Sequence, residues 1–339
     1  MRRATVSLMY EGKDISGDIA PDLLSFTFTD KSGSKGEADD LQVIISDRNR
    51  VWQDAWCPQR GHAMQAGILC TDWFEPGDCL ELPCGTFQVD EVEFEAGETD
   101  RITIKGVPSA VKTSITGQKK TRAWNSTSLQ QIAADIAAEA GLTLLYRGEA
   151  VPLQRVEQRQ EPDLAFLHRV GGEYGCRVKV YADKLVVYSG TEADGLDAIV
   201  LTRSVTSNFR GKIVTAEVYS SCVVTFTDPA SGKDFRYTYT PDDAPKTGKV
   251  LTVNRRVESV EAAQRMARAA LRGKNAGQMS GEWEGMGDPR LRAGGCKDGK
   301  LFALVVKDHV DAREALGQIA KVDEAPLQFA AAVVDGFQR

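Results

Sequence analysis

Apolar and polar residues alternate along much of the first 110 residues, a pattern typical of β-strands that bury one face. The alternation is clearest at residues 4–10, 24–29, 41–45 and 86–94. Clusters of Gly, Pro and Asp separate these segments and favour turns. The first third of the chain therefore predicts an antiparallel β-barrel or β-sandwich.

One of these strands carries an irregularity. Phe87 and Val89 lie on one face of the segment, whereas Val92 and Phe94 fall on the other, so the alternation slips near Asp90. A β-bulge, which adds one residue to a strand, produces such a slip. We expect a bulge here that bends the strand, as suits a barrel.

Helical spacing replaces the alternation after residue 125. Ser126, Thr127 and Ser128 offer hydroxyl caps for a helix that stops at Gly141. The buried side of this helix is predicted to comprise Leu129, Ile132, Ala133, Ile136 and Ala140. Residues 142–146 follow as a short strand.

A second helix is predicted to begin at Pro162 and to end near Gly175. Its buried side comprises Leu164, Phe166, Leu167 and Val170. Gly171 and Gly172 are expected to break the helical pattern, and they lack the strand and the Lys-Ser/Thr context of a phosphate loop. Residues 177–188 then predict a hairpin that turns at 182–184, which completes a small α/β unit.

A second β-rich region follows this unit. Strands are predicted at residues 213–219, 222–226 and 235–239, the last two joined by a turn at 228–233. A helix is predicted at residues 258–273, with an inward side made of Val260, Ala263, Ala267, Ala270 and Leu271. Its arginines, Arg265, Arg268 and Arg272, fall on another side and could pair with acidic residues of a neighbouring chain.

Composition narrows the class of protein. The chain has 339 residues, enough for two or three domains, and its apolar content of 42% is that of a globular protein. No run of eighteen apolar residues and no charged-then-apolar leader occurs, so neither a membrane span nor a secretory signal is expected. The net charge of -6 argues weakly against a nucleic-acid binder.

The cysteines raise the question of a metal. Seven are scattered along the chain: Cys57, Cys70, Cys79, Cys84, Cys176, Cys222 and Cys296. Only Cys79 and Cys84 lie close together, and a single pair without partner ligands is not the usual zinc set. Free buried thiols are the favoured interpretation, and no metal or other cofactor is expected.

Two groups of residues could carry catalysis. Glu91, Glu93 and Glu95 alternate on one strand and could cleave glycosides, although a solvated or lumen-facing strand edge is the favoured interpretation. His168 has no nucleophile motif nearby, so a structural role is favoured, and His62 and His309 are isolated. We therefore assign no catalytic, cofactor-binding or metal-binding residues.

A basic cluster offers another candidate site. Lys112, Lys119, Lys120 and Arg122 lie beside Trp124, a mixture of charge and aromatic surface that can hold a phosphate backbone. The acidic net charge instead favours a subunit contact or a solvated linker between domains.

Several segments together resemble a known family. Residues 112–144, KTSITGQKKTRAWNSTSLQQIAADIAAEAGLTL, and 158–180, QRQEPDLAFLHRVGGEYGCRVKV, resemble the inserted segment of the late control D family, the phage tail hub proteins. The resemblance extends, in the same order, to residues 22–64, 85–91, 257–259 and 285–289. It covers about residues 15–293, and the chain departs from the family pattern after Gly294.

The resemblance implies an α+β protein with four parts. They are a first β-barrel-like tube domain at 1–111, an inserted α/β domain at 112–204, a second tube domain with a helix at 205–300, and a divergent segment at 301–339. Three chains, each with two similar barrels, would form a pseudo-sixfold ring. We expect exposed strand edges in 1–110 and 205–295 to join the chains.

The function implied is structural and not enzymatic. The ring would be the hub of a contractile tail baseplate, joining the sixfold tail tube to the threefold spike and leaving a lumen for DNA. Its partners would be further copies of the chain, the tail spike protein, and tube and baseplate proteins. It would assemble in the host cytoplasm and reside in the virion tail baseplate. The alternatives are the hub of a contractile secretion device and a peptidoglycan-binding or peptidoglycan-degrading tail-tip module.

Overall fold

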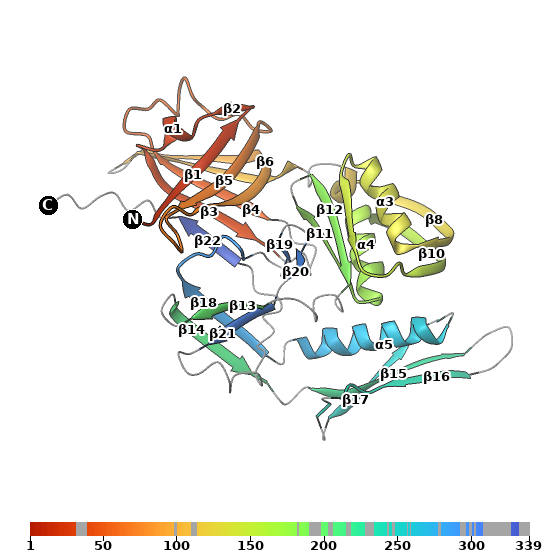
Figure 1. Cartoon of the computed structure of the whole chain (residues 1–339). Helices are drawn as coiled ribbons and strands as arrows, with labels where there is room; N and C mark the ends of the chain where they lie inside the picture. The colour runs from red at the N-terminus through yellow and green to blue at the C-terminus, as the bar shows by residue number, and fades with distance from the viewer. Residues whose placement is uncertain are drawn as a thin grey trace.

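The structure is a computed structural model of the chain (Figure 1). It describes residues 1–31, 39–97, 100–109, 114–181, 183–189, 198–202, 206–214, 218–227, 234–242, 244–245, 248–255, 257, 259–276, 279–291, 296–297, 300–301, 303–307 and 327–331. The predicted turn at 228–233 and His309 lie outside these ranges.

One antiparallel sheet, here called the first sheet, dominates the N-terminal part. Its strands run in the order β2-β1-β5-β6-β7-β4-β3-β22. Their bounds are β1 Arg3–Tyr10, β2 Lys13–Asp14, β3 Leu23–Asp30, β4 Asp40–Ser46, β5 Ala63–Thr71, β6 Cys79–Glu95, β7 Arg101–Pro108 and β22 Leu327–Ala331, with the short helix α1 at Ser16–Ile19. The last strand, β22, pairs with β3 and also contacts β1, so the C-terminal part of the chain returns to the first sheet.

Alternation in the sequence builds the core of this sheet. Phe26 on β3 pairs with Val43 on β4, and Phe28 pairs with Leu41; all four side chains are buried. The register of β6 against β7 shifts between Val89 and Glu91, which confirms the predicted bulge. Strands β5 and β7 were not predicted, although Ile102 and Ile104 of β7 alternate with polar residues and are buried.

Residues 114–189, here called the inserted domain, combine helices with two small sheets. Its elements are α2 Ser114–Gly117, β8 Lys119–Ser128, α3 Leu129–Glu139, β9 Thr143–Arg147, β10 Pro152–Pro162, α4 Asp163–Glu173, β11 Cys176–Tyr181 and β12 Lys184–Ser189. β12 lies between β11, which is antiparallel to it, and β9, which is parallel. β8 and β10 form a separate antiparallel pair.

The local signals of the two helices are confirmed. The Ser128 hydroxyl accepts a hydrogen bond from the Gln131 N–H, which caps α3, and Gly141 follows it with φ +70°. Pro162 is the residue immediately before α4. Gly171 and its neighbour do not break α4: an added Cβ at Gly171 would lie 3.3 Å from the Cys176 carbonyl oxygen, so this glycine permits close packing on β11.

The remaining strands form small sheets, one of which packs on a long helix. They are β13 Ala198–Thr202 paired with β21 Ala303–Lys307, β14 Thr206–Ile213 with β18 Met279–Gly285, β15 Tyr219–Thr227 between β16 Asp234–Tyr239 and β17 Lys249–Asn254, and β19 Cys296–Lys297 with β20 Lys300–Leu301. Helix α5, Val260–Asn275, packs on the β16-β15-β17 sheet through Ala263, Met266, Ala267 and Leu271. Figure 1 shows α5 between this sheet and the inserted domain.

Two predictions for this region are wrong in part. Val260 is 52% exposed because it begins α5, ahead of the turns that meet the sheet. The strand predicted at 213–219 does not continue through Val214 and Val218, which lie outside β14 and β15. The Asn275 side chain bonds both the N–H (2.9 Å) and the carbonyl (2.8 Å) of Tyr219, which fixes the start of β15.

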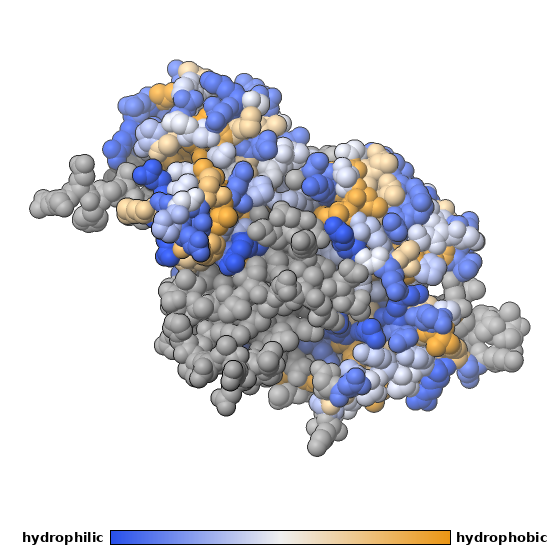
Figure 2. Space-filling view, viewed as in Figure 1, coloured by the Kyte–Doolittle hydropathy of each residue, from blue (hydrophilic) through white to orange (hydrophobic). Residues whose placement is uncertain are grey.

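The mixture of many strands with a few helices, divided among several sheets, agrees with the predicted α+β class. On the face seen in Figure 2, the described surface is mostly polar, and apolar side chains gather in small groups. No helix among the described residues has the length and apolar character needed to cross a membrane.

Candidate functional site: the junctions of the inserted domain

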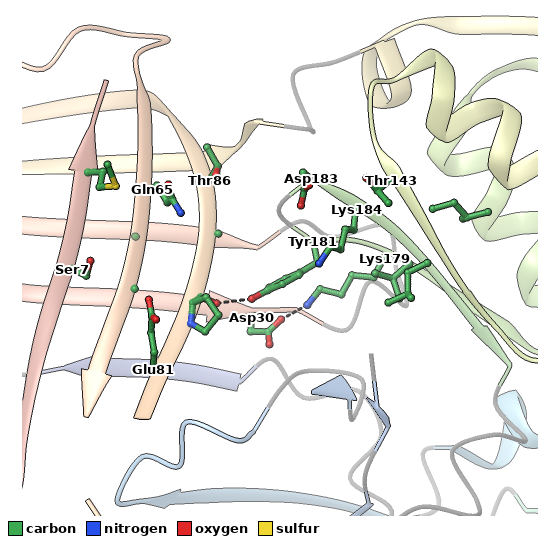
Figure 3. Close-up of a pocket in the computed structure, with 18 of the residues that line it drawn as sticks. Ser7, Asp30, Gln65, Glu81, Thr86, Thr143, Lys179, Tyr181, Asp183 and Lys184 are labelled. Carbon is green, nitrogen blue, oxygen red and sulfur yellow. Dashed lines mark hydrogen bonds and ion pairs between the residues drawn. The ribbon is translucent and has the colours of Figure 1, made fainter. Parts of the chain in front are cut away.

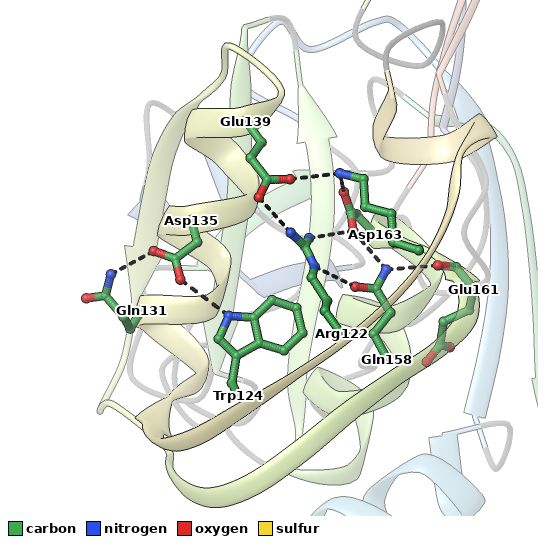
Figure 4. A network of polar contacts seen from close by, with 9 residues as sticks. Arg122, Trp124, Gln131, Asp135, Glu139, Gln158, Glu161 and Asp163 are labelled. Carbon is green, nitrogen blue, oxygen red and sulfur yellow. Dashed lines mark hydrogen bonds and ion pairs between the residues drawn. The ribbon is translucent and has the colours of Figure 1, made fainter.

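Two cations of the predicted basic cluster lie in a network inside the inserted domain (Figure 4). The carboxylate of Asp163, whose side chain is 2% exposed, accepts from Lys120 Nζ at 2.6 Å and from Arg122 Nη2 at 2.7 Å. Both cations also bond Glu139, at 2.8 and 2.6 Å. The Arg122 guanidinium lies 4.6 Å from the centre of the Trp124 ring.

The hydrogen bonds of this network set the pKa values of its charged groups and determine the role of its two cations. Burial opposes the charge on Lys120, but hydrogen bonds to Asp163 and Glu139 outweigh it and raise its pKa. Hydrogen bonds to the same lysine and to Arg122 lower the pKa of Glu139. Both cations are therefore used to hold β8, α3 and α4 together, and neither a phosphate site nor a solvated linker describes them. Lys112 lies outside the described residues.

The inserted domain meets the first sheet through a buried ion cluster (Figure 3). Lys179 Nζ on β11 contacts Asp30 Oδ1 at the end of β3 and lies 3.3 Å from Asp39 Oδ1. The backbone N–H of Lys31 also donates to Asp39, at 2.8 Å. Nearby, the Tyr181 hydroxyl donates to the Pro83 carbonyl at 2.5 Å. We call Lys179, Asp30 and Asp39 the lysine cluster.

Burial shapes the charges of the lysine cluster. It raises the pKa of Asp39 to about 6, although Lys179 acts in the opposite direction. Burial would lower the pKa of Lys179, but the two carboxylates outweigh it and the pKa is raised. Beside the cluster, a cleft of about 820 Å³ separates β1, β5 and β6 of the first sheet from β9 and β12 of the inserted domain.

A second junction joins the inserted domain to α5 and to Arg255, the residue that follows β17. Glu173, at the end of α4, pairs with Arg255 at 3.0 Å, and Glu149 lies 3.8 Å from Arg265. An added Cβ at Gly175 would lie 3.1 Å from the Cβ of Ala269, so the backbone after α4 packs directly on α5. Arg265, for which a partner in a neighbouring chain was considered, thus lies near a carboxylate of its own chain.

The packing at Gly175 gives a testable difference between two glycines. Gly141 and Gly175 both have positive φ, +70° and +75°, but nothing lies within 4 Å of an added Cβ at Gly141. Gly175→Ala should therefore cost about 1 kcal/mol or more beyond Gly141→Ala, because only the former is also overpacked. Urea unfolding measures both. Equal losses would show that the backbone, and not the contact with α5, sets the cost.

The third junction joins the first sheet to the segment after β18. The Trp73 indole N–H, in the β5–β6 turn, donates to the Gly287 carbonyl at 2.7 Å. The Arg290 guanidinium lies 4.7 Å from the centre of the Phe74 ring and pairs with Asp288 at 2.6 Å. Three separate sequence regions are therefore tied into one body by polar and aromatic contacts.

The acidic strand is exposed and paired. Glu91 and Glu93 lie 3.1 and 3.2 Å from Lys105, and Glu95 lies 2.7 Å from Arg101. Hydrogen bonds to Glu91 and Glu93 raise the pKa of Lys105. None of these three carboxylates lines the cleft of about 820 Å³ beside the lysine cluster.

Histidines and cysteines occupy scattered positions. His62 shares a hydrogen bond of 2.8 Å with the Tyr10 hydroxyl. Four thiols are buried as expected, Cys70, Cys84, Cys176 and Cys222, whereas Cys57 and Cys79 are exposed, contrary to the prediction, because they lie in a surface loop and at a strand end. Among the described residues, no three His, Cys, Asp or Glu side chains are grouped to hold a metal ion.

Burial lowers the pKa of His168, which has a consequence for stability. In the unfolded chain the His168 side chain has a pKa of about 6.5, so it binds a proton more readily there than in the folded chain. The folded chain is therefore fully stable with respect to this group above about pH 6.5. Its free energy of unfolding falls as the pH drops toward the folded pKa, because protonation of His168 favours the unfolded chain. His168→Gln should therefore reduce the fall in melting temperature between about pH 7.5 and about pH 5. Circular dichroism would record both curves, and an unchanged fall would contradict the assignment.

The junction residues Lys179, Asp30, Asp39 and Trp73 were not singled out from the sequence. A lysine inside an apolar alternating strand, Val178-Lys179-Val180, was the available signal, since buried lysines need partners. One of its partners, Asp30, lies 149 residues away in the sequence, and no local pattern identifies such a distant carboxylate.

Known proteins resemble the chain in both sequence and structure. It is 30% identical over 207 residues to the probable baseplate hub protein of Escherichia phage P2, covering 58% of this chain and 49% of that protein. The corresponding protein of Escherichia phage 186 is 29% identical over 181 residues, covering 53% and 43%. The chain thus spans about half the length of these curated relatives. No family model matches it.

Solved structures extend the similarity to the fold. The 43 kDa tail protein of prophage MuSo2 from Shewanella oneidensis matches with a TM-score of 0.64 at 17% identity, covering 98% of this chain and 95% of that one. The predicted resemblance to phage tail hub proteins is confirmed by the named relatives. The family name itself stays a prediction.

Proposed function

We propose that the chain is a structural hub of a contractile phage tail baseplate. The observation that carries the proposal is its sequence similarity to two baseplate hub proteins. The three junctions support it, because a hub transmits load and needs its parts held as one body. On this proposal the chain is not an enzyme and resides in the virion tail baseplate after assembly in the host cytoplasm.

The proposed assembly is a trimer with pseudo-sixfold symmetry. The first sheet would close into one barrel, which is supported by the contact of β22 with both β3 and β1. The strands and helix between residues 205 and 300 would supply the second barrel, and residues 112–204 would be the insert. Two similar barrels in each of three chains present six similar faces, as a sixfold tube requires.

The partners follow from this geometry. Exposed strand edges within residues 1–110 and 205–295 would join neighbouring chains. One end of the ring would meet the tail tube and the other the spike protein, with baseplate proteins around it. DNA would pass through the lumen without sequence-specific binding.

Electron microscopy and an assay of cell-wall binding and degradation together test this proposal. Electron microscopy of the purified chain with its spike protein should show rings with threefold symmetry and six similar lobes. The same preparation should neither bind cell-wall sacculi nor release soluble fragments from them. Binding or release without rings would favour the wall-acting alternative and reject the hub.

A further inference from the structure

The lysine cluster differs from the other ion pairs of the described residues, because each of its members is buried. The side chains of Lys179, Asp30 and Asp39 are 10%, 0% and 5% exposed. Asp163, by contrast, pairs with cations that are 19% and 24% exposed. Buried ions lose their hydration, so such a cluster is a costly way to join two domains.

The cluster also contains one carboxylate more than an ion pair needs. Lys179 Nζ contacts Asp30 directly, while Asp39 lies beside them, fixed by the N–H of Lys31. With its pKa raised to about 6 by burial, Asp39 can take up and return a proton near neutral pH. A nucleophile, an acyl carbon and a proton carrier are thus placed together on side chains that are at most 10% exposed.

We propose that Lys179 and Asp30 form an isopeptide bond, with Asp39 as the proton carrier, which ties the inserted domain covalently to the first sheet.

The reaction is balanced within the cluster. The Lys179 ammonium gives one proton to Asp39, and the amine Nζ attacks Cγ of Asp30. The bond from Cγ to one carboxyl oxygen then breaks, and that oxygen leaves as water with two protons from the original ammonium, one of them delivered by Asp39. An ammonium and a carboxylate thus become an amide and water, and no other reactant is needed.

Burial favours the product and holds the reactants in place. The amide is uncharged, so its formation removes two buried charges. The fold holds the Lys179 amine and the Asp30 carboxyl in contact, so the two groups need not meet by diffusion before they react. The raised pKa of Lys179 makes the first proton transfer unfavourable, so we expect a slow, single reaction after folding.

The bond would reinforce a weak boundary. The first sheet and the inserted domain have separate hydrophobic cores, and a cleft opens beside their contact. Interfaces with little shared apolar surface permit domain motion. A covalent tie between residues 149 apart along the chain would keep the two domains together under load.

The mass of the denatured full-length chain tests the proposal. After incubation at neutral pH, the chain should weigh less than its sequence by one water molecule. Trypsin should yield residues 14–31 joined to residues 178–184, without cleavage after Lys179. The full sequence mass together with cleavage after Lys179 would overturn the proposal and leave an ion cluster only.

Three variants assign the roles. Lys179→Arg removes the nucleophile and Asp39→Asn removes the proton carrier, so both should keep the full mass. Lys184→Arg, which alters another lysine lining the same cleft, should still lose water. Loss of water in Asp39→Asn would contradict the role of Asp39. The mass of the unaltered chain remains decisive if a variant fails to fold.

Discussion

Replacing Asp163 with alanine is expected to lower the free energy of unfolding by about 3–5 kcal/mol, because it leaves two cations without their buried partner. Lys120 and Arg122 both donate to this carboxylate, and Gln158 Nε2 donates to it at 2.8 Å. Three donors would lose their acceptor at once. The contact that joins β8 to the start of α4 would be lost with them.

Chemical denaturation followed by circular dichroism measures this loss. Glu139→Gln is the matched control, because Glu139 binds the same two cations but its side chain is 45% exposed. Exposed pairs contribute about 1 kcal/mol or less, so the control should change stability little. If both variants lost the same small amount, the buried network would not be what holds the inserted domain together.

Phe28→Ala is expected to cost about 3–5 kcal/mol, because truncating a buried aromatic ring leaves a cavity. Phe28 is fully buried in the first sheet, and its ring centre lies 6.1 Å from that of Phe87, nearly edge to face. Its loss removes both the buried area and the ring contact.

Another position on β3 supplies the control for this variant. Leu24 lies on the same strand, β3, and is 49% exposed. Leu24→Ala should change the unfolding free energy by about 0.5 kcal/mol or less. Urea unfolding compares the two. A small loss in Phe28→Ala would contradict the assigned core of the first sheet.

Local patterns in the sequence predicted local structure well. The cap at Ser128, the stop at Gly141 and the helical spacing between them define α3 within a few residues of chain. The slip near Asp90 likewise identifies the bulge, since a bulge changes the side-chain alternation of a single strand. Such signals need no knowledge of distant residues.

The junctions depend on distant residues and could not be predicted in the same way. Trp73 and Gly287 are 214 residues apart, and a tryptophan in a turn does not reveal its acceptor. The basic cluster shows the same limit: its charges are visible in the sequence, but the carboxylate of Asp163 becomes their partner only once α4 packs against β8.

The native mass of the 339-residue chain, alone and with the proposed spike partner, tests the proposed hub most directly. Light scattering over a concentration series should give three times the chain mass for the chain alone, and with the spike protein a heavier complex that contains three copies of the chain. A monomer in both conditions at every concentration would contradict the proposed trimeric hub.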